Sequence, residues 1–567
     1  MPCCGSWSMS ERRWWAAMLL WSTLLGILVT WPMALDPLGA VIGHPEASVG
    51  CHIWVLWWAQ SHLGDFTTPM IFHPYGADVI ELYGSDLLSP LLVSGLPLSP
   101  GLLYNLWVLG LLIAGGLGAA WLCRRAGCAA SGSAVGAAVF TTAPFFQHEL
   151  LNGTSELIAA AILPWFTGAL MSTIAAPSVR RGLLVGILAG IAISLSAYNP
   201  FFLMLLLVMF LIHRVVSDPA PVFTAPMRRA VGAAAGVGML FAGPVGWLHL
   251  THGAGQTFSR RESWLTQDPP LPDSFADLLD WVDPRAADIP ALMPMRDGLS
   301  FEYWTTCTVY LGLTALLLAA LSLRRTDSAR PFPAILLVSV LIACGPYLRV
   351  AGESVALLGV KLPLPGLTLA TLFPPFIVTA MHSYRYTAVA VLALAVLAGR
   401  GARRPWWAGL IVLETLLLAP VPWPAPTTPI PESVVLTTLR DMPPGAVFTA
   451  PMERENLGDL GRLLIAQTIH EKPVHDGGIH RRAGEEATRL FAENALVDGL
   501  SAQGGPEWPG EEDTARGLTQ LYSLDYRYIL MPTDAEEGLA WGLERLGEPD
   551  VRDALWVLWV LGEVGSP

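Results

Sequence analysis

The residues best suited to chemistry lie in residues 43–58 (GHPEASVGCHIWVLWW), a segment rich in histidine, carboxylate and tryptophan that follows the first apolar stretch. His44 and Glu46 stand two residues apart near its start. A carboxylate or a neutral imidazole can take a proton from an attacking hydroxyl group. We therefore expect Glu46 or His44 to act as a general base. The cluster of residues that could present such a base comprises His44, Glu46, His52, His73, Asp78, Glu81 and Asp86.

Membrane-spanning helices must position this segment, because the composition excludes an ordinary soluble protein. Of the 567 residues, 53% are hydrophobic and 14% are charged, and the mean hydropathy is +0.49. A helix needs about 20 mostly apolar residues to cross a bilayer, and the sequence predicts an all-α polytopic membrane protein with about eleven spans. The predicted spans are residues 14–35, 102–123, 130–147, 155–176, 182–197, 200–215, 230–250, 305–323, 332–348, 386–399 and 405–422.

Clusters of arginine lie at alternate ends of successive spans, which is the pattern of cytoplasmic loops. This pattern predicts a cytoplasmic N-terminus. It also places the first outer loop, residues 36–101, and everything after residue 423 on the extracytoplasmic side. The clusters are Arg12 and Arg13, Arg124 and Arg125, Arg180 and Arg181, Arg214 with Arg228 and Arg229, Arg324 and Arg325, and Arg400 with Arg403 and Arg404.

Charge divides the chain into a neutral part and an acidic part. From Pro424 to Pro567 there are 24 acidic and 11 basic residues, so this part carries the whole net charge of −13. Because nucleic acid attracts basic surfaces, we expect no nucleic-acid partner. The pattern predicts a transmembrane domain at residues 1–423 and, after a proline-rich spacer, a soluble α/β domain at residues 424–567. Its expected strands are 445–452, 526–532 and 554–562, and its expected helices are 459–470, 485–500 and about 536–546.

The tryptophans of the first outer loop predict a second feature of that loop. Ile53, Trp54, Trp57 and Trp58 recur at helical spacing. Tryptophan is enriched at the membrane–water interface, where an amphipathic helix can lie in the plane of the bilayer. We therefore expect a helix over residues 49–63 that lies flat on the membrane surface.

Four stretches resemble the GT-C class of membrane glycosyltransferases, which transfer a sugar from a polyprenyl-phosphate carrier. They are residues 43–58, 103–125 (LYNLWVLGLLIAGGLGAAWLCRR), 146–165 (FQHELLNGTSELIAAAILPW) and 381–401 (MHSYRYTAVAVLALAVLAGRG), within a similar layout over roughly residues 14–530.

The resemblance implies a GT-C fold, a lipid-linked sugar donor, a glycan or lipid acceptor from the cell envelope and, with membrane lipids around the spans, a place in the bacterial inner membrane. That class carries a carboxylate in the first outer loop, usually an aspartate directly after a glycine. Here His44 follows Gly43, which leaves Glu46, two residues further on, as the carboxylate candidate.

Other residues are candidates for binding substrates. His52 and His73 lie in the first outer loop, and His148 and Glu149 lie in a short outer loop after the third predicted span. Arginines outside the membrane suit a lipid phosphate, because the guanidinium group matches phosphate oxygens. The candidates of this kind are Arg260, Arg261 and Arg385. The alternatives are helix capping around residues 148–156 and an interfacial aromatic anchor with a snorkelling arginine at residue 385.

Glu414 lies inside the last predicted span, where a carboxylate is costly unless it has partners. Because the spans hold few other charges, a structural role for Glu414 is favoured over proton-coupled transport. No cofactor is predicted. The histidines of the first outer loop match no compact metal motif, and His470, His475 and His480 fit a glycine-containing loop better than a zinc site.

A non-catalytic scaffold or lipid-carrier-binding protein is the alternative to an enzyme, and a transporter or flippase ranks third. A Glu46 that points into bulk solvent would favour the scaffold.

Overall fold

The computed structural model divides the chain into two compact units. Unit 1 comprises Met1–Ala34, Ser85–Ser89 and Leu106–Pro426, and unit 2 comprises Leu35–Gly84, Pro90–Asn105 and Thr427–Pro567. The residues that the structure describes are 9–62, 64–65, 67–79, 86, 88–93, 95–217, 224–252, 276, 278, 281–282, 308–324, 331–350, 353–372, 382–452, 457–477, 490, 493–501 and 507–562.

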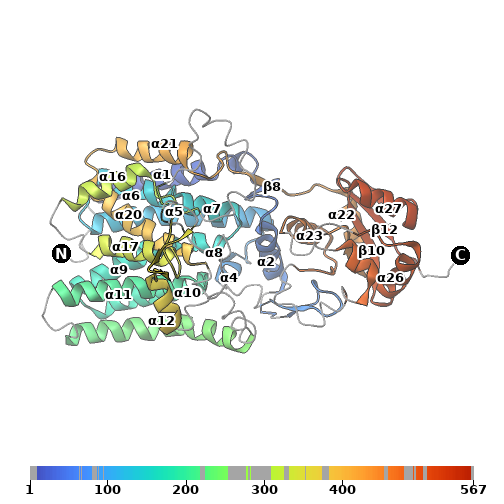
Figure 1. The fold of residues 1–567 in the computed structure, drawn as a ribbon, viewed down its shortest axis with the longest axis horizontal. Helices are drawn as coiled ribbons and strands as arrows, with labels where there is room; N and C mark the ends of the chain where they lie inside the picture. The colour runs from blue at the N-terminus through green and yellow to red at the C-terminus, as the bar shows by residue number, and fades with distance from the viewer. Residues whose placement is uncertain are drawn as a thin grey trace. The chain divides into compact units, whose positions relative to one another are not determined.

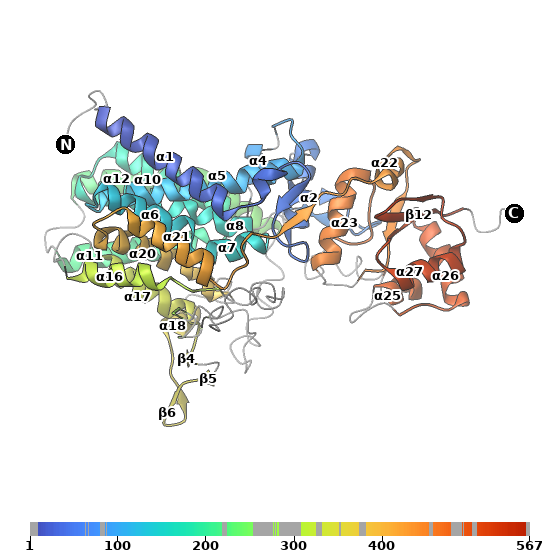
Figure 2. The same cartoon turned by 90° about the horizontal axis from the view of Figure 1, so that it is seen from above.

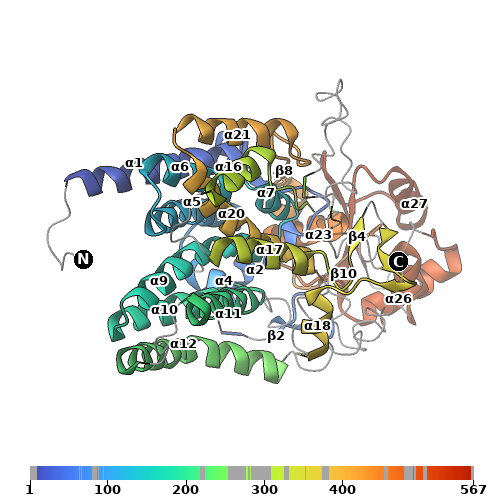
Figure 3. The same cartoon turned by 60° about the vertical axis from the view of Figure 1, so that its left-hand side comes forward.

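Unit 1 is a helical bundle, and Figures 1 and 3 show α9 to α12 side by side within it. Proline at the first or second position begins α7 and α9, where the missing N–H costs nothing. The helices are α1 (Met9–Val29), α5 (Pro100–Arg125), α6 (Ala130–Thr141), α7 (Pro144–Leu151), α8 (Ser155–Ile158), α9 (Leu163–Ala175), α10 (Val179–Leu195), α11 (Asn199–Ser217), α12 (Ala225–His252), α16 (Leu313–Leu323), α17 (Pro331–Ala343), α18 (Pro365–Leu372), α20 (Thr387–Gly401) and α21 (Trp406–Leu418), with 3-10 turns η1 (Met33–Leu35), η2 (Ala159–Ile162) and η4 (Ser383–Tyr386).

The core of unit 1 is α20, whose residues from Thr387 to Gly399 are all buried. It packs against α6, α16 and α17. A Cβ atom on Gly399 would lie 2.6 Å from the carbonyl oxygen of Gly132 on α6, so only glycine allows this approach. Small residues serve this purpose between membrane helices, because van der Waals packing drives their association. The predicted span at residues 386–399 therefore corresponds to a fully buried helix.

Four helices in the described part of the chain are long and apolar enough to cross a membrane: Pro100–Arg125, Ser155–Ala175, Asn199–Ser217 and Ala225–Leu248. Three shorter apolar helices are Leu313–Leu323, Pro331–Ala343 and Trp406–Leu418. The predicted membrane-spanning character is thus confirmed. The predicted number of about eleven spans stays a prediction.

Glu414 has the structural role that its solitary position predicts. Its carboxylate accepts hydrogen bonds from the Tyr310 hydroxyl at 2.6 Å and from the N–H groups of Leu313 at 2.5 Å and Thr314 at 2.9 Å. Leu313 is the first residue of α16, so Glu414 satisfies donors that the helix itself leaves without partners. These hydrogen bonds stabilise the folded protein strongly in an apolar environment, because a backbone N–H group without a partner there raises its free energy.

Unit 2 holds a four-stranded sheet in the order β11-β12-β10-β9. β10 pairs parallel with β9 and antiparallel with β12, with Leu530 opposite Thr449 and Leu558. A second small sheet pairs β1 with β8, where Val41 lies opposite Thr428. The strands are β1 (Ala40–Ile42), β2 (Thr67–Thr68), β3 (Ala77–Asp78), β8 (Thr427–Pro429), β9 (Ala446–Thr449), β10 (Tyr526–Pro532), β11 (Val551–Arg552) and β12 (Trp556–Val560).

Unit 2 also contains helices, and one of them comes from the first outer loop. They are α2 (Val49–His62), α22 (Val434–Asp441), α23 (Leu457–His470), α25 (Ala495–Leu500), α26 (Glu511–Ser523) and α27 (Glu536–Leu546), and α4 (Leu88–Val93) begins in unit 1 and ends in unit 2. Residues 427–567 thus contain a mixed sheet with helices, and the predicted domain boundary at residue 424 stays a prediction. Most of the expected helix 485–500 lies outside the described residues, and its last turns form α25.

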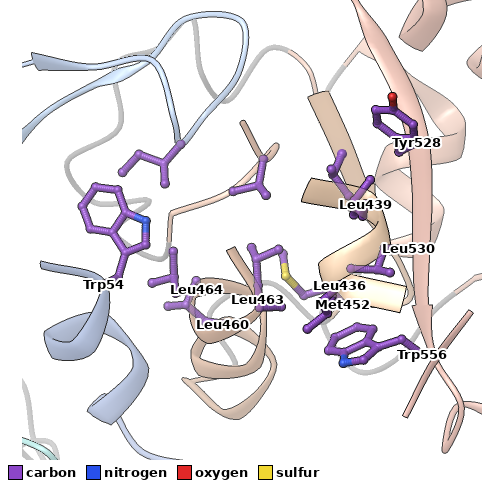
Figure 4. Close-up of a cluster of buried hydrophobic side chains, with 14 of the residues drawn as sticks. Trp54, Leu436, Leu439, Met452, Leu460, Leu463, Leu464, Tyr528, Leu530 and Trp556 are labelled. Carbon is purple, nitrogen blue, oxygen red and sulfur yellow. The ribbon is translucent and has the colours of Figure 1, made fainter. Parts of the chain in front are cut away.

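The tryptophans of α2 correct the prediction of a helix lying flat on the membrane. Trp54 and Trp58 are buried and stack with their ring centroids 5.8 Å apart. They join a hydrophobic cluster with Leu460, Leu463 and Leu530, part of which is drawn in Figure 4. The Trp54 indole donates to Gln467 Oε1 at 2.7 Å. Helical spacing of tryptophans suits either a lipid interface or a protein core, and here α23 covers them.

The packing of α2 also changes the grouping of the first outer loop. The predicted transmembrane domain, residues 1–423, includes this loop at residues 36–101. In the structure, Leu35–Gly84 and Pro90–Asn105 belong to unit 2 with Thr427–Pro567. The physical reason is a shared hydrophobic cluster. In it, side chains of α2 in the first outer loop pack against side chains of α22, α23 and β10 in the C-terminal part, and each set buries the other.

Candidate functional site

Asp86 is the first polar side chain of a buried cluster within unit 1. It lies in the predicted first outer loop, just before α4, and is 9% exposed. Its carboxylate accepts hydrogen bonds from the Ser89 N–H at 2.9 Å and from the Ser89 hydroxyl. Burial raises the pKa of Asp86 to about 7, against the opposing effect of the Ser89 bonds, and the charge of Glu156 raises it further. Asp86 therefore changes its charge near neutral pH.

The turn between α7 and α8 supplies two more carboxylates. Asn152 and Gly153 form this turn, and Gly153 has a positive φ of 72° that favours glycine. Glu149 is fully buried and accepts a hydrogen bond from the Thr154 hydroxyl. Glu156, in the first turn of α8, is 8% exposed. The turn between α7 and α8 thus holds both carboxylates inside the bundle rather than at its surface.

Arg385 provides the cation of the cluster. It lies in η4, immediately before the buried helix α20. Its guanidinium carbon lies 4.5 Å from the centre of the Tyr198 ring and 5.8 Å from that of Tyr384. Arg385 also interacts electrostatically with Glu149 and Glu156. A half-buried guanidinium held between aromatic rings and carboxylates keeps its orientation better than one on an open surface.

Tyr384 connects Arg385 to Glu149. Its hydroxyl donates to Glu149 Oε1 at 2.9 Å, and Arg385 Nε lies 3.5 Å from the same hydroxyl oxygen. We name Asp86, Glu149, Glu156 and Arg385 the carboxylate–arginine cluster. It has three acidic groups for one guanidinium, so a proton held on one carboxylate reduces the excess negative charge. Asp86 has the raised pKa that such a proton requires.

His148 lies beside this cluster but is already engaged in the fold. It is fully buried, with Nε2 3.0 Å from Asn152 Nδ2 and Nδ1 3.4 Å from the Thr308 hydroxyl. The structure therefore brings His148, Glu149 and Arg385, which the sequence gives as separate candidates, into one region of unit 1. His148 and Glu149 are fully buried and hydrogen-bonded to neighbouring side chains, Asn152 and Tyr384 respectively. In this setting they hold other side chains in place. Their predicted role in binding substrate stays a prediction.

His44 and Glu46 lie in unit 2, and Glu46 is exposed. The Glu46 N–H donates to His44 Nδ1 at 3.1 Å. Burial lowers the pKa of His44, and the charge of Glu46 opposes this effect. The imidazole is therefore mainly neutral at pH 7 and able to accept a proton. The catalytic role of this pair stays a prediction, and the exposure of Glu46 is the feature that the sequence analysis associates with a scaffold.

The other histidines of the first outer loop contact protein groups. The ring centre of His52 lies 6.3 Å from that of Tyr104. His73 Nε2 lies 2.9 Å from the Leu524 carbonyl oxygen, and the His73 carbonyl accepts the Tyr526 hydroxyl at 2.6 Å. His73 thus ties the loop to the α/β domain, which is a structural role that its sequence position does not reveal.

Arg260, Arg261 and Glu81 lie outside the described residues.

The part of the chain that the structure describes holds no group of three or more His, Cys, Asp or Glu side chains arranged to bind a metal ion. His470 accepts the Lys472 N–H at its Nδ1 at 3.1 Å, and burial with the charge of Lys472 lowers its pKa to about 3. His475 lies against the Phe448 ring at 4.6 Å. These two histidines are thus core residues of unit 2, and His480 lies outside the described residues.

Asp86 is one of the polar residues noted in the first outer loop, but the sequence singles out neither Asp86 nor Glu156 as a site residue. The signal was available for Asp86, because an Asp three residues before a Ser, followed by an apolar run, is a helix-start pattern that fixes the carboxylate. Tyr198 gave no signal, since it joins the site only through the fold. Tyr384 would belong to the interfacial anchor that is the alternative at residue 385, and in the structure it is 5% exposed and bonded to Glu149.

No family model matches the chain, and no curated protein matches it. Among solved structures, the mycobacterial arabinofuranosyltransferase AftD is similar over 93% of this chain, with a TM-score of 0.53 and 16% identity. The chain spans 37% of the length of AftD. This likeness confirms the predicted GT-C fold.

Two other solved structures are more distant. The oligosaccharyltransferase AglB of Archaeoglobus fulgidus is matched over 95% of this chain and 72% of its own, with 12% identity and a TM-score of 0.44. ArnT of Cupriavidus metallidurans is matched over 98% of this chain and 99% of its own, with 12% identity and a TM-score of 0.39.

Proposed function

We propose that this protein is a membrane glycosyltransferase of the GT-C type. It transfers a sugar from a polyprenyl-phosphate-linked donor to a lipid or polysaccharide acceptor of the cell envelope. The observation that carries this proposal is the carboxylate–arginine cluster, which combines a proton acceptor of raised pKa with a held guanidinium group inside a GT-C fold. The site belongs to unit 1, which also contains three of the four long apolar helices and most of the fourth, Pro100–Arg125.

The reaction requires one proton transfer and one bond exchange. The acceptor hydroxyl oxygen attacks the anomeric carbon of the donor, its proton passes to a carboxylate, and the bond from the anomeric carbon to the phosphate oxygen breaks. The leaving group is the polyprenyl phosphate, which departs as an anion. Asp86 suits the proton transfer, because a base whose pKa is near the working pH is efficient.

Arg385 suits the stabilisation of the leaving phosphate. A guanidinium group binds phosphate oxygens through two parallel hydrogen bonds, and its charge stabilises the negative charge that develops as the bond breaks. Tyr198 and Tyr384 fix its plane, and Glu149 fixes Tyr384. Arg260 and Arg261 remain proposed donor contacts from the sequence.

Glu46 and His44 are a second proposed base, and His52 and His73 remain proposed substrate contacts. The two proposed bases differ in surroundings, because Asp86 is buried and Glu46 is exposed. Burial favours Asp86, since removal of water strengthens the interaction of a base with its proton donor.

We also propose the location. Arginine clusters support a multi-pass protein of the bacterial inner membrane with a cytoplasmic N-terminus and an extracytoplasmic α/β domain. Lipid-linked donor and envelope acceptor would then meet at the outer face.

The proposal is tested by mass spectrometry of envelope glycans and lipid-linked sugars in a deletion strain. We expect one glycan product to be lost and one lipid-linked sugar to accumulate. The wild-type gene should restore the product, and Asp86→Asn should not, although the variant protein is present in the membrane. Glu46→Gln with His44→Ala is the matched variant for the other base. Restoration by both variants would contradict a base at either position.

The exposure of Glu46 favours one other function, a non-catalytic scaffold or lipid-carrier-binding protein. A scaffold predicts that Asp86→Asn, and Glu46→Gln with His44→Ala, all restore the envelope as the wild type does. The same complementation experiment therefore separates the two functions.

A further inference from the structure

Four tryptophans of unit 1 form a row of neighbouring rings that has no place in the proposed chemistry. The rings of Trp14 and Trp15 on α1 meet edge to face with their centres 4.9 Å apart. Trp15 stacks with Trp165 of α9 at 6.3 Å, and Trp165 stacks with Trp121 of α5 at 5.4 Å. Three helices thus contribute to one row of rings, and all four residues keep part of their surface exposed.

Close packing of α5 against α9 fixes the rings of this row. A Cβ atom on Gly118 of α5 would lie 2.5 Å from Trp165 Nε1, and one on Gly168 of α9 would collide with the Trp121 ring. The Trp165 indole donates to the Ala114 carbonyl oxygen at 2.9 Å. The aromatic surface is therefore already formed before any ligand binds.

An arginine lies over each end of the row. The guanidinium carbon of Arg124 is 4.7 Å from the centre of the Trp14 ring, and that of Arg125 is 5.3 Å from the centre of the Trp121 ring. Contact with an aromatic ring orients a guanidinium group, and the planar group still has N–H donors along its edge for phosphate oxygens. We name the four tryptophans together with these two arginines the tryptophan–arginine cluster.

The end of α5 places this cluster at the depth of lipid headgroups. α5 is long and apolar enough to cross a membrane, and its last two residues are Arg124 and Arg125. Trp121 lies one turn before them, and Trp165 contacts α5 at Gly118, about 10 Å before Arg125 along the helix axis. Figure 2 shows the first turns of α1 likewise at one end of the bundle of unit 1, on its outer side. Tryptophan and arginine are typical of this layer of a membrane protein.

Positive charge is in excess around the cluster. Arg12 and Arg13 begin α1 beside it, because the neighbouring Glu11 Oε1 lies 3.8 Å from Arg124 Nη2. α1, α5 and α9 together contain four arginines and one acidic residue, Glu11. All four arginines are exposed. This end of the three helices therefore attracts an anion.

An exposed apolar face of α1 continues from the cluster. Leu19 is 48% exposed, Leu20 62% and Leu24 52%, and these residues lie in the turns after Trp15. A ligand that matches both the cluster and this face is anionic at one end and apolar along its length. An anionic phospholipid has this chemistry, and basic sites between membrane helices bind such headgroups.

We infer that the tryptophan–arginine cluster is a binding site for one anionic phospholipid. Arg124 and Arg125 hold its phosphate, the tryptophans contact its glycerol region, and an acyl chain lies along the leucines of α1. The lipid comes from the leaflet at this end of the helices, which the arginine pattern predicts to be cytoplasmic. The inference is independent of the proposed sugar transfer.

The test measures lipid binding to the purified full-length protein in detergent micelles. Phosphatidylglycerol, phosphatidylcholine or inorganic phosphate is titrated in, and binding is followed by native mass spectrometry and by the unfolding temperature. Arg124→Gln with Arg125→Gln is the test variant. Arg403→Gln with Arg404→Gln is the matched control, because it removes the same charge from another pair of exposed neighbouring arginines. Arg124→Lys with Arg125→Lys keeps the charge and serves as a second test variant.

We expect the wild type to retain one phosphatidylglycerol and to unfold at a higher temperature with it, whereas phosphatidylcholine and inorganic phosphate have little effect. The glutamine test variant should need at least about tenfold more phosphatidylglycerol, the lysine variant an intermediate amount, and the control variant the wild-type amount. Equal binding of both lipids, or an equal loss in the test and control variants, would overturn the inference, because the attraction would then not be specific to this site. Displacement of the lipid by inorganic phosphate would also overturn it, since the site would then bind a free anion. None of these results depends on enzymatic activity.

Discussion

Replacing Asp86 with asparagine should remove a pH-dependent cost from the folded protein. The asparagine side chain would keep an oxygen that accepts from the Ser89 N–H, so the local hydrogen bonding changes little. The change removes the ability to ionise inside unit 1. In the wild type, burial raises the pKa of Asp86 from 3.8 to about 7. One pKa unit corresponds to about 1.4 kcal/mol, so ionisation of Asp86 costs the folded state roughly 4 kcal/mol as an upper bound.

The direction of the effect follows from the folded pKa being raised. Below about pH 4, Asp86 is protonated in both the folded and the unfolded state, and the cost is absent. Between about pH 4 and 7, the unfolded state releases the proton and the folded state keeps it, so the free energy of unfolding falls as the pH rises. Above about pH 7, the cost is complete and constant.

The assay is thermal unfolding of the purified protein in detergent from pH 4 to 9. We expect Asp86→Asn to unfold at nearly the wild-type temperature at pH 4 and at a higher temperature at pH 8. Asp441→Asn is the control, because the Asp441 side chain is 76% exposed and should show no such difference. Parallel curves for wild type and Asp86→Asn across the whole pH range would refute the raised pKa and, with it, the choice of Asp86 as base.

Three further changes test other parts of the structure. Arg385→Lys should raise KM for the lipid-linked donor about tenfold to a hundredfold, because lysine lacks the two-pronged contact to phosphate; an unchanged KM would speak against a phosphate contact. Glu414→Leu should lower the free energy of unfolding by at least about 2 kcal/mol, since it leaves three donors without an acceptor; thermal unfolding checks this, and wild-type stability would refute the capping role. Trp54→Ala should destabilise unit 2 by about 3–5 kcal/mol. The half-buried Trp57 of the same helix, changed to alanine, should cost clearly less, and equal losses would argue against a core role for Trp54.

Local patterns in the sequence predicted several elements of the α/β domain well. The expected strand 526–532 and the expected helix 536–546 agree with β10 and α27 in their bounds. Both elements have a clear local pattern in the sequence. β10 is an almost continuous apolar run, which is typical of a buried strand, and α27 has one apolar face. The structure likewise bears out the inference for Glu414, because a lone carboxylate in an apolar helix requires hydrogen-bond donors nearby.

Long-range partners account for what the sequence did not reveal. The tryptophans of α2 have the spacing of a buried face, but the residue that bonds Trp54 is Gln467, more than 400 positions further on. Asp86, Glu156 and Arg385 likewise come from three separate segments, and each one alone has an ordinary explanation as a cap or an anchor. Their electrostatic coupling arises only when the bundle places them together. A sequence pattern gives only local spacing, so it cannot show that residues from separate segments form one site.

The central claim is that the carboxylate–arginine cluster transfers sugar from a lipid phosphate. The most direct measurement reconstitutes the purified protein in vesicles with the lipid-linked sugar that accumulates in the deletion strain and an envelope acceptor. Release of polyprenyl phosphate and labelling of the acceptor are then followed from pH 5 to 9. We expect one polyprenyl phosphate per sugar transferred, a rate that rises with pH to a plateau above about 7, and a loss of roughly 10²- to 10⁴-fold with Asp86→Asn. Wild-type turnover by Asp86→Asn, or no turnover by the wild type, would contradict the account.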